Sequence, residues 1–194
     1  LRAAIAGAAV YGSGTAAYAQ STWPNKPVTM IVPFPAGGGT DAFARPLAAQ
    51  FTRLSGKSLV IDNRGGAGGT LGAGIAAKAA PDGYTLFMTS GSIVTANQHI
   101  YRKMPFDPEK DLAAVTGAAS GPQVIAVHPT LPAKTLKEFI GMAKAKPKFF
   151  SFGSAGFSTQ THLSGENFMH AAGMDAVHIP YKGEGPALID LVAG

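Results

Sequence analysis

The sequence contains no cysteine, which excludes disulfide bonds, a thiolate nucleophile and a Cys-ligated metal site. Charged residues are also few, at 14% of the 194 residues. The formal net charge is +5, but lysine and arginine are scattered along the chain and form no long run. This scatter does not favour a nucleic-acid-binding or membrane-surface patch, so we expect no nucleic-acid partner. Beyond the first 19 residues no stretch is long and apolar enough to span a membrane.

Complete catalytic motifs are absent as well. No G-x-S-x-G elbow occurs, and none of the five histidines stands in an H-E-x-x-H pattern. Gly72–Ala77 matches G-x-G-x-x-A, but it does not directly follow a predicted strand and no acidic residue lies roughly 20 positions on. We therefore expect no catalytic residue, no cofactor and no metal. An α/β enzyme that binds a nucleotide or an acyl substrate, and a pure interaction module, remain the alternatives.

The first 19 residues predict a signal peptide. They are small and apolar, with Arg2 their only charge, and they end at 17–19 in the A-x-A pattern of a cleavage site. We expect Gln20 to begin the mature protein and the protein to be periplasmic. A buried N-terminal helix is the alternative, which three glycines in the segment disfavour.

Strands and helices alternate through the rest of the chain. The first half has predicted strands at 28–32, 59–61 and 84–88, and predicted helices at 41–54 and 70–80. Thr40 is the expected N-cap of the first helix, whose apolar stripe is Phe43, Leu47, Phe51 and Leu54. The second half has predicted strands at 124–127, 149–152 and 177–179, and predicted helices at 135–145, 159–172 and 186–193.

This alternation indicates two α/β lobes with mainly parallel sheets. The segment 115–122 is rich in small residues and is a plausible crossover between them. We place the first lobe at 20–118 and the second at 119–194. The helix at 186–193 has nothing after it to pack against, so we expect the second lobe to be incomplete at its C-terminal side.

Two loops share one design, a glycine-rich turn that leaves a strand and enters a helix. They are 35–41, Pro-Ala-Gly-Gly-Gly-Thr-Asp, and 153–159, Gly-Ser-Ala-Gly-Phe-Ser-Thr. In open α/β sheets ligands bind at the carboxyl ends of strands, where a helix N-terminus offers free N–H groups to an anion. The pair predicts an anion site between the lobes. Each loop taken alone is also compatible with an ordinary strand-to-helix connection.

Several side chains near these loops are further candidates, each with a second interpretation. Asp41 stabilises a helix start, but it would repel a carboxylate unless it orients a water or a ligand donor. Lys182 either attracts an anion or is a solvated loop residue, and His162 either touches ligand or packs. The full predicted ligand-binding set is Phe34, Pro35, Ala36, Gly37, Gly38, Thr40, Asp41, Ser90, Ser154, Ala155, Gly156, Ser158, Thr159, His162, Tyr181 and Lys182.

The stretch 23–41 resembles the extracytoplasmic receptors of tripartite tricarboxylate transporters. Further stretches fit the same family, namely 63–69, 79–86, 153–163 and 180–188. The resemblance covers everything after the predicted signal peptide. It implies a periplasmic-binding-protein-like fold with two lobes around a cleft, and a small carboxylate held largely by backbone N–H groups. It also implies a monomer that delivers its ligand to integral-membrane transporter subunits, and a missing C-terminal third.

Overall fold

The computed structural model describes residues 23–194. The predicted signal peptide therefore lies outside the described residues. Within them, no helix combines the length and the apolar character that crossing a membrane requires.

The first α/β unit is built on a parallel sheet with strand order β2-β1-β3. Its strands are β1 (Val28–Val32), β2 (Leu59–Asn63) and β3 (Thr85–Phe87). The central strand β1 reads Val-Thr-Met-Ile-Val, and four of its five residues are buried. A strand covered on both faces needs such a nearly continuous apolar run. The prediction of a strand at 28–32 is confirmed residue for residue.

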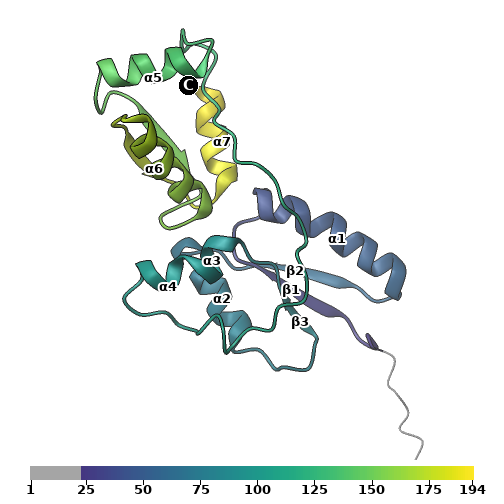
Figure 1. The fold of residues 1–194 in the computed structure, drawn as a ribbon. Helices are drawn as coiled ribbons and strands as arrows, with labels where there is room; N and C mark the ends of the chain where they lie inside the picture. The colour runs from purple at the N-terminus through teal and green to yellow at the C-terminus, as the bar shows by residue number, and fades with distance from the viewer. Residues whose placement is uncertain (1–22) are drawn as a thin grey trace, which may run out of the picture.

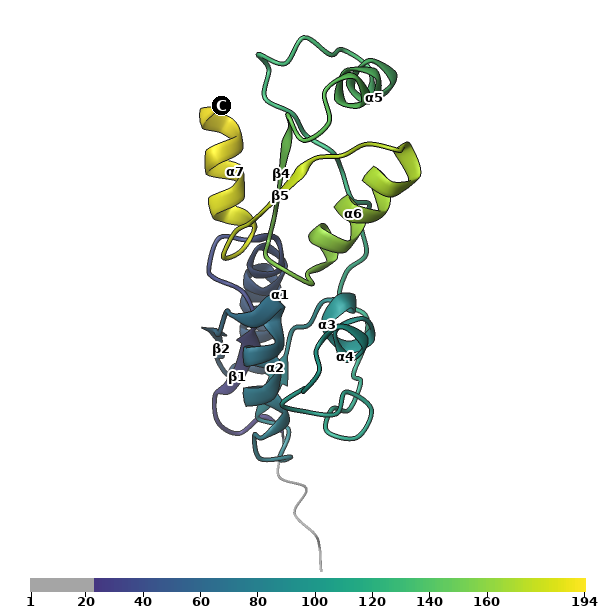
Figure 2. The same cartoon turned by 90° about the vertical axis from the view of Figure 1, so that its left-hand side faces the viewer.

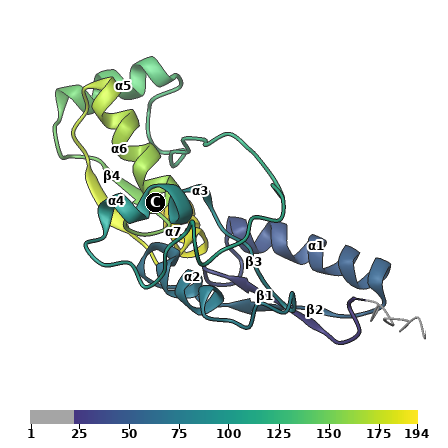
Figure 3. The ribbon, with the colours of Figure 1, turned by 60° about the horizontal axis from the view of Figure 1, so that its bottom comes forward.

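Helices cover both faces of this sheet. The longest is α1 (Gly39–Ser55), and α2 (Thr70–Ala77) follows a short 3-10 turn, η1 (Ala67–Gly69). Figures 1 and 3 show α1 and α2 on opposite sides of the strands. Two short helices, α3 (Gly91–Thr95) and α4 (Asn97–Ile100), complete the unit. One core lies between α1 and the sheet, and a second joins Ala73 of α2 to Ile93 and Phe106.

Two predictions for α1 are wrong in detail. The N-cap is Gly38 rather than Thr40, because the extended backbone of Gly38 lets the helix begin at Gly39. The buried face carries Ala44 and Ala48, whereas Phe43 and Leu54 are 58% and 74% exposed. Small side chains let the helix backbone approach the sheet closely, so the alanine face is packed inward, and of the predicted apolar stripe Phe51 packs against this core.

The second α/β unit has a two-stranded parallel sheet, β4 (Ser151–Ser154) and β5 (Val177–Pro180). Its helices are α5 (Leu136–Ala145), α6 (Gln160–Ala172) and α7 (Glu184–Ala193). The predicted helix signals are confirmed where they are local. Thr135 caps α5 by accepting a hydrogen bond from the N–H of Glu138, and Gly173 ends α6 with a positive φ of 62°.

The predicted strand at 124–127 is wrong. Residues 112–128 have no regular secondary structure, and Val124 is 83% exposed. A strand is stable only when a neighbouring strand pairs with its edge, and in the described part of the chain β4 and β5 pair only with each other. The segment instead forms most of the long link that joins the two units in Figures 1 and 2.

Candidate functional site at the junction of the two units

The two glycine-rich loops lie at the junction of the two units. Figure 2 shows α6 and α7 beginning at this junction, next to the first unit. Loop 1, defined here as residues 33–41, and loop 2, residues 153–159, contribute to one small cavity of about 10 Å³. Its lining residues are Phe34, Gly38, Gly39, Thr40, Ala155 and Glu184. A cavity of this size holds about one water molecule.

Loop 1 presents the N-terminus of α1 to this cavity. The first hydrogen bond of the helix runs from the N–H of Ala42 to the carbonyl of Gly38. The amides of Gly39, Thr40 and Asp41 therefore have no carbonyl partner within the helix, as at every helix start. These N–H groups, with the partial positive charge of the helix end, favour an anion at this point.

Asp41 shapes loop 1, and nearby hydrogen-bond donors balance the negative charge of its carboxylate. Its buried carboxylate accepts hydrogen bonds from Gly37 N at 2.9 Å, Arg45 Nε at 2.6 Å and Asn63 Nδ2 at 3.1 Å. Burial opposes ionisation, but the bonds from Arg45, Gly37 and Asn63 outweigh it and hold the pKa of Asp41 below its usual value. Of the two interpretations of Asp41, the structure favours a role in shaping the loop.

The hydroxyl groups of loop 2 already have partners within the protein. Ser154 Oγ lies 2.7 Å from His178 Nε2 and accepts from Gly156 N at 3.1 Å. Thr159 is the N-cap of α6, and its hydroxyl donates to the carbonyl of Gly156 at 2.6 Å. These side chains hold the loop's shape, so the groups that loop 2 offers to a ligand are the main-chain amides at the start of α6.

Two histidines, His162 and His178, contact loop 2. The rings of His162 and His178 stack with centroids 4.0 Å apart and an interplanar angle of 28°. His162 is buried, and its Nδ1 accepts from the N–H of Ser158 at 3.2 Å. Together with Glu166 the two histidines place potential metal-ligand atoms within 4.8 Å of one another. Stacked rings do not aim their in-plane lone pairs at a common point, however, so this geometry favours packing over metal binding.

The stability of the protein should depend on pH through His178. Burial, and then the neighbouring His162, lower the pKa of His178 from its usual 6.5. The unfolded chain therefore binds a proton more readily than the folded one, and this contribution to stability is present above about pH 6.5 and lost as the pH falls toward the folded-state pKa. Each unit of pKa difference corresponds to about 1.4 kcal/mol.

Urea unfolding between pH 7.5 and 5 would test this dependence. Wild type should lose more free energy of unfolding over that range than His178→Gln, which keeps a hydrogen-bonding group but does not titrate. The exposed His170 provides a matched control, and His170→Gln should follow the wild-type curve. Parallel curves for wild type and His178→Gln would contradict the assignment.

The remaining predicted residues are spread around the junction. Ser90 is the N-cap of α3, and its hydroxyl lies 3.3 Å from that of Ser92. The Tyr181 hydroxyl donates to Asp190 on α7 at 2.7 Å, and Lys182 is exposed. Pro35 and Ala36 are exposed on loop 1. The structure thus brings loop 1 and Ala155 together, whereas the polar ends of Ser90 and Tyr181 are bound within their own units.

Two features of the junction were not predicted. The first is Glu184, the first residue of α7, whose Oε2 accepts a hydrogen bond from Gly39 N at 2.6 Å. The turn from β5 into α7 is another glycine-containing strand-to-helix turn, and this was the available signal. The second is the contact of Tyr101 with loop 2, in which Ser158 Oγ donates to the Tyr101 hydroxyl at 2.9 Å.

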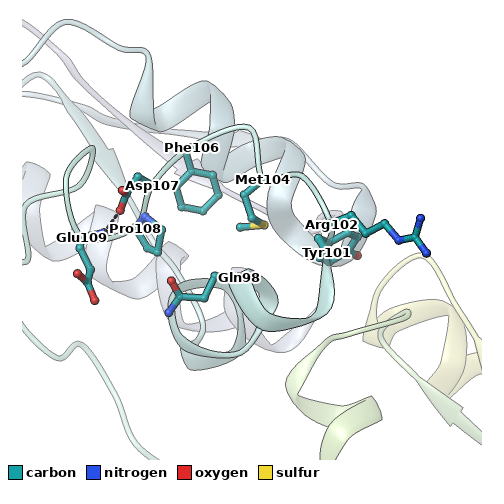
Figure 4. A pocket seen from close by; sticks show the side chains of 8 residues that line it. All are labelled: Gln98, Tyr101, Arg102, Met104, Phe106, Asp107, Pro108 and Glu109. Carbon is teal, nitrogen blue, oxygen red and sulfur yellow. Dashed lines mark hydrogen bonds between the residues drawn. The ribbon is translucent and has the colours of Figure 1, made fainter.

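A larger hollow of about 370 Å³ lies elsewhere on the first unit (Figure 4), with walls formed by Gln98, Tyr101, Arg102, Met104, Phe106, Asp107, Pro108 and Glu109. It is open to solvent, and Asp107 is occupied by an ion pair with Lys110 at 2.7 Å. The glycine-rich loops do not contribute to it. We therefore place the candidate site at the junction.

Comparison with known proteins identifies the family of this chain. The family model described as the tripartite tricarboxylate transporter family receptor matches residues 43–194. The chain belongs to this receptor family. Its family and its fold are those of periplasmic solute-binding receptors rather than enzymes. The predicted resemblance and the predicted α/β fold class are therefore both confirmed.

Solved structures of related receptors superpose well on this chain. A protein described as a periplasmic transporter is 41% identical, with a TM-score of 0.82 over 89% of this chain and 58% of its own. Rpa4515 of R. palustris, solved with adipate, is 36% identical, with a TM-score of 0.81 over 89% and 57%. MatC of Rhodopseudomonas palustris, solved with bound malate, is 31% identical, with a TM-score of 0.76 over 89% and 58%.

The matched part is only a portion of those proteins. The chain spans 54% and 59% of the length of two curated relatives that it matches over nearly all of its own residues. Parts of a related receptor's ligand site can therefore lie outside the region that matches this chain.

Proposed function

We propose that this protein is a periplasmic receptor that binds a small carboxylate at the junction of its two units and delivers it to a membrane transporter. The observation that carries the proposal is the Glu184 carboxylate on the amide of Gly39 at 2.6 Å. It is a carboxylate from the chain itself, held at the helix N-terminus that the sequence marks as an anion site. The adipate and malate bound by related receptors support the same ligand class.

The proposal includes the organisation of the chain. Residues 1–19 would be removed on export, 20–118 would form the first lobe and 119–194 would belong to the second. The receptor would act as a monomer, because a closed anion site between two lobes of one chain needs no second copy. No cofactor or metal takes part in this binding chemistry.

Binding strength is within reach of such a site. Hydrogen bonds to a charged group contribute about 1.5–3 kcal/mol each. Micromolar affinity corresponds to about 8 kcal/mol. Roughly three to five such bonds are therefore sufficient, and the free amides at the starts of α1 and α6 supply donors of this kind.

Calorimetry of the full-length protein against mono-, di- and tricarboxylates and aromatic acids tests the ligand class. At least one acid should bind with micromolar affinity or better, because its oxygens can accept from the free amides. The matched neutral amides of the same acids should bind at least about 100-fold more weakly, since they lose charge-assisted hydrogen bonds.

Two further measurements make the proposal refutable. The bound acid should be recovered chemically unchanged after prolonged incubation, and its uptake by cells should depend on the protein. Equal binding of acids and amides would contradict the anion site. Conversion of the acid would contradict a receptor role, and uptake that persists after deletion of the protein would contradict delivery.

A further inference from the structure

Glu184 is placed between two helix starts. It is the first residue of α7, where an acidic side chain would ordinarily stabilise its own helix. Its carboxylate instead reaches across the junction to the first amide of α1, 145 residues earlier in the chain. The backbone is also close, because a Cβ added at Gly38 would lie 3.9 Å from Glu184 N. The carboxylate of the first residue of α7 thus occupies the N-terminus of α1.

Glu184 differs from the neighbouring acid Asp41 in its charge balance. Asp41 is paired with Arg45, with Nε to Oδ2 at 2.6 Å. Among residues 23–194 no lysine, arginine or histidine lies within 4.0 Å of the Glu184 carboxylate. Its Oε2 accepts a hydrogen bond from the N–H of Gly39. Its Oε1 accepts no hydrogen bond from the described residues. The site therefore contains one half-buried carboxylate whose second oxygen is free to accept a donor.

This placement bears directly on any carboxylate that enters the site. The cavity of about 10 Å³ leaves no room for a ligand carboxylate beside Glu184 at Gly39. A bound acid must therefore displace Glu184 from that amide, and Glu184 then remains in the wall of the site, next to a like charge. Like charges at such a distance repel, and more strongly so away from bulk water. A hydroxyl or ammonium group on the ligand would relieve this repulsion by donating to Glu184.

We propose that Glu184 is a specificity-determining residue, selecting acids that carry a hydroxyl or ammonium group next to a carboxylate over acids that carry only hydrocarbon there. The inference rests on the proposed function, since it needs a carboxylate at the start of α1. It adds a requirement that a generic anion site does not have. A helix N-terminus alone would prefer the acid with the most negative charge, whereas Glu184 favours an acid that carries a hydrogen-bond donor.

Succinate, malate and aspartate test this directly, because they share a four-carbon dicarboxylate skeleton and differ in the donor. Full-length wild type should bind malate or aspartate at least about 10-fold more tightly than succinate, as expected for one hydrogen bond to a charged group. Glu184→Gln should bind succinate about 10-fold more tightly than wild type does, and should reduce the preference to less than about threefold. Malate and aspartate separate the hydroxyl from the ammonium form of the donor.

Matched variants serve as controls, and a second ligand series repeats the test. Glu109→Gln removes the same charge at an exposed position of the first unit and should leave the preference unchanged. Glu184→Ser keeps a residue suited to a helix start and replaces Glu184→Gln if that variant does not fold. The series 3-phenylpropanoate, phenyllactate and phenylalanine repeats the comparison for a larger ligand.

The outcomes separate this inference from the proposed function. A preference for the donor-bearing acid that is lost in Glu184→Gln or Glu184→Ser and kept in Glu109→Gln supports it. Tight binding of succinate by wild type, or a preference that both Glu184 variants retain, overturns it while leaving the carboxylate receptor intact. Failure of every acid in both series to bind wild type overturns the proposed function as well.

Discussion

Replacing Gly68 by alanine is expected to lower carboxylate affinity by about 100-fold, although Gly68 lies outside both glycine-rich loops. A Cβ at this position would stand 2.5 Å from Ser158 Oγ and 2.6 Å from the carbonyl oxygen of Phe157. The carbonyl belongs to the backbone of loop 2, so relief requires the loop to move away from the first unit. Losing two charge-assisted hydrogen bonds at about 1.5–3 kcal/mol each accounts for an effect of this size.

Gly56→Ala is the matched control for this change. Gly68 and Gly56 both have left-handed backbones, with φ of +60° and +69°, so alanine costs each position about 1–2 kcal/mol of strain. No atom lies within 4 Å of a Cβ at Gly56. Both variants should therefore lose stability in thermal unfolding, Gly68→Ala the more because of its clash with loop 2, while calorimetry should show a loss of binding only for Gly68→Ala. Unchanged affinity in both variants would show that loop 2 need not face loop 1 for binding.

Replacing Gly38 by valine is expected to abolish carboxylate binding, with a loss of more than about 100-fold, while the protein stays folded. Gly38 has an extended backbone, with φ −84° and ψ 175°, which a β-branched residue accepts. A Cβ there would make ordinary contacts, 3.7 Å to the Pro35 carbonyl oxygen and 3.9 Å to Glu184 N. The rest of the side chain would fill the space between α1 and α7, where the anion enters.

Stability and affinity should therefore separate in this variant. The free energy of unfolding should fall by no more than about 1–3 kcal/mol, the usual cost of extra methyl groups in a filled space, because the Cβ itself meets no close contact. Gly117→Val, in the exposed link with no neighbour within 4 Å, is the control and should bind like wild type. Normal affinity in Gly38→Val would mean that the anion approaches α1 from another direction.

Local sequence signals predicted the elements whose stability is local. The run at 28–32 forms β1 because its β-branched and apolar residues suit a strand covered on both faces. Thr135 and Glu138 begin α5, and Gly173 ends α6, because caps act within one helical turn. The glycine-rich loops were recognisable for the same reason, since a turn and the first helical amides lie within a few residues of each other.

Apart from the N-cap of α1, the predictions that differed from the structure depended on a distant partner. The apolar run at 124–127 has strand propensity but no strand beside it in the described chain. The face of α1 that packs inward depends on how closely Ala44 and Ala48 approach the sheet. This closeness is a property of the two packed surfaces rather than of the helix alone. The sequence predicted that the hydroxyl groups of Ser154 and Thr159 bind ligand, but they bond to groups of the protein, including His178 on β5.

The sequence by itself determined the α/β alternation, the family resemblance and the two helix starts that can hold an anion, because each depends on residues close together in the chain. Only the tertiary structure decided which groups share the site. In the folded protein the charge of Asp41 is balanced by a hydrogen bond from Arg45, so Asp41 shapes loop 1. Folding also brings Glu184 to the amide of Gly39, across 145 residues. The physical reason is that hydrogen bonds and charge repulsion act over a few ångströms, and only folding sets which distant residues come that close.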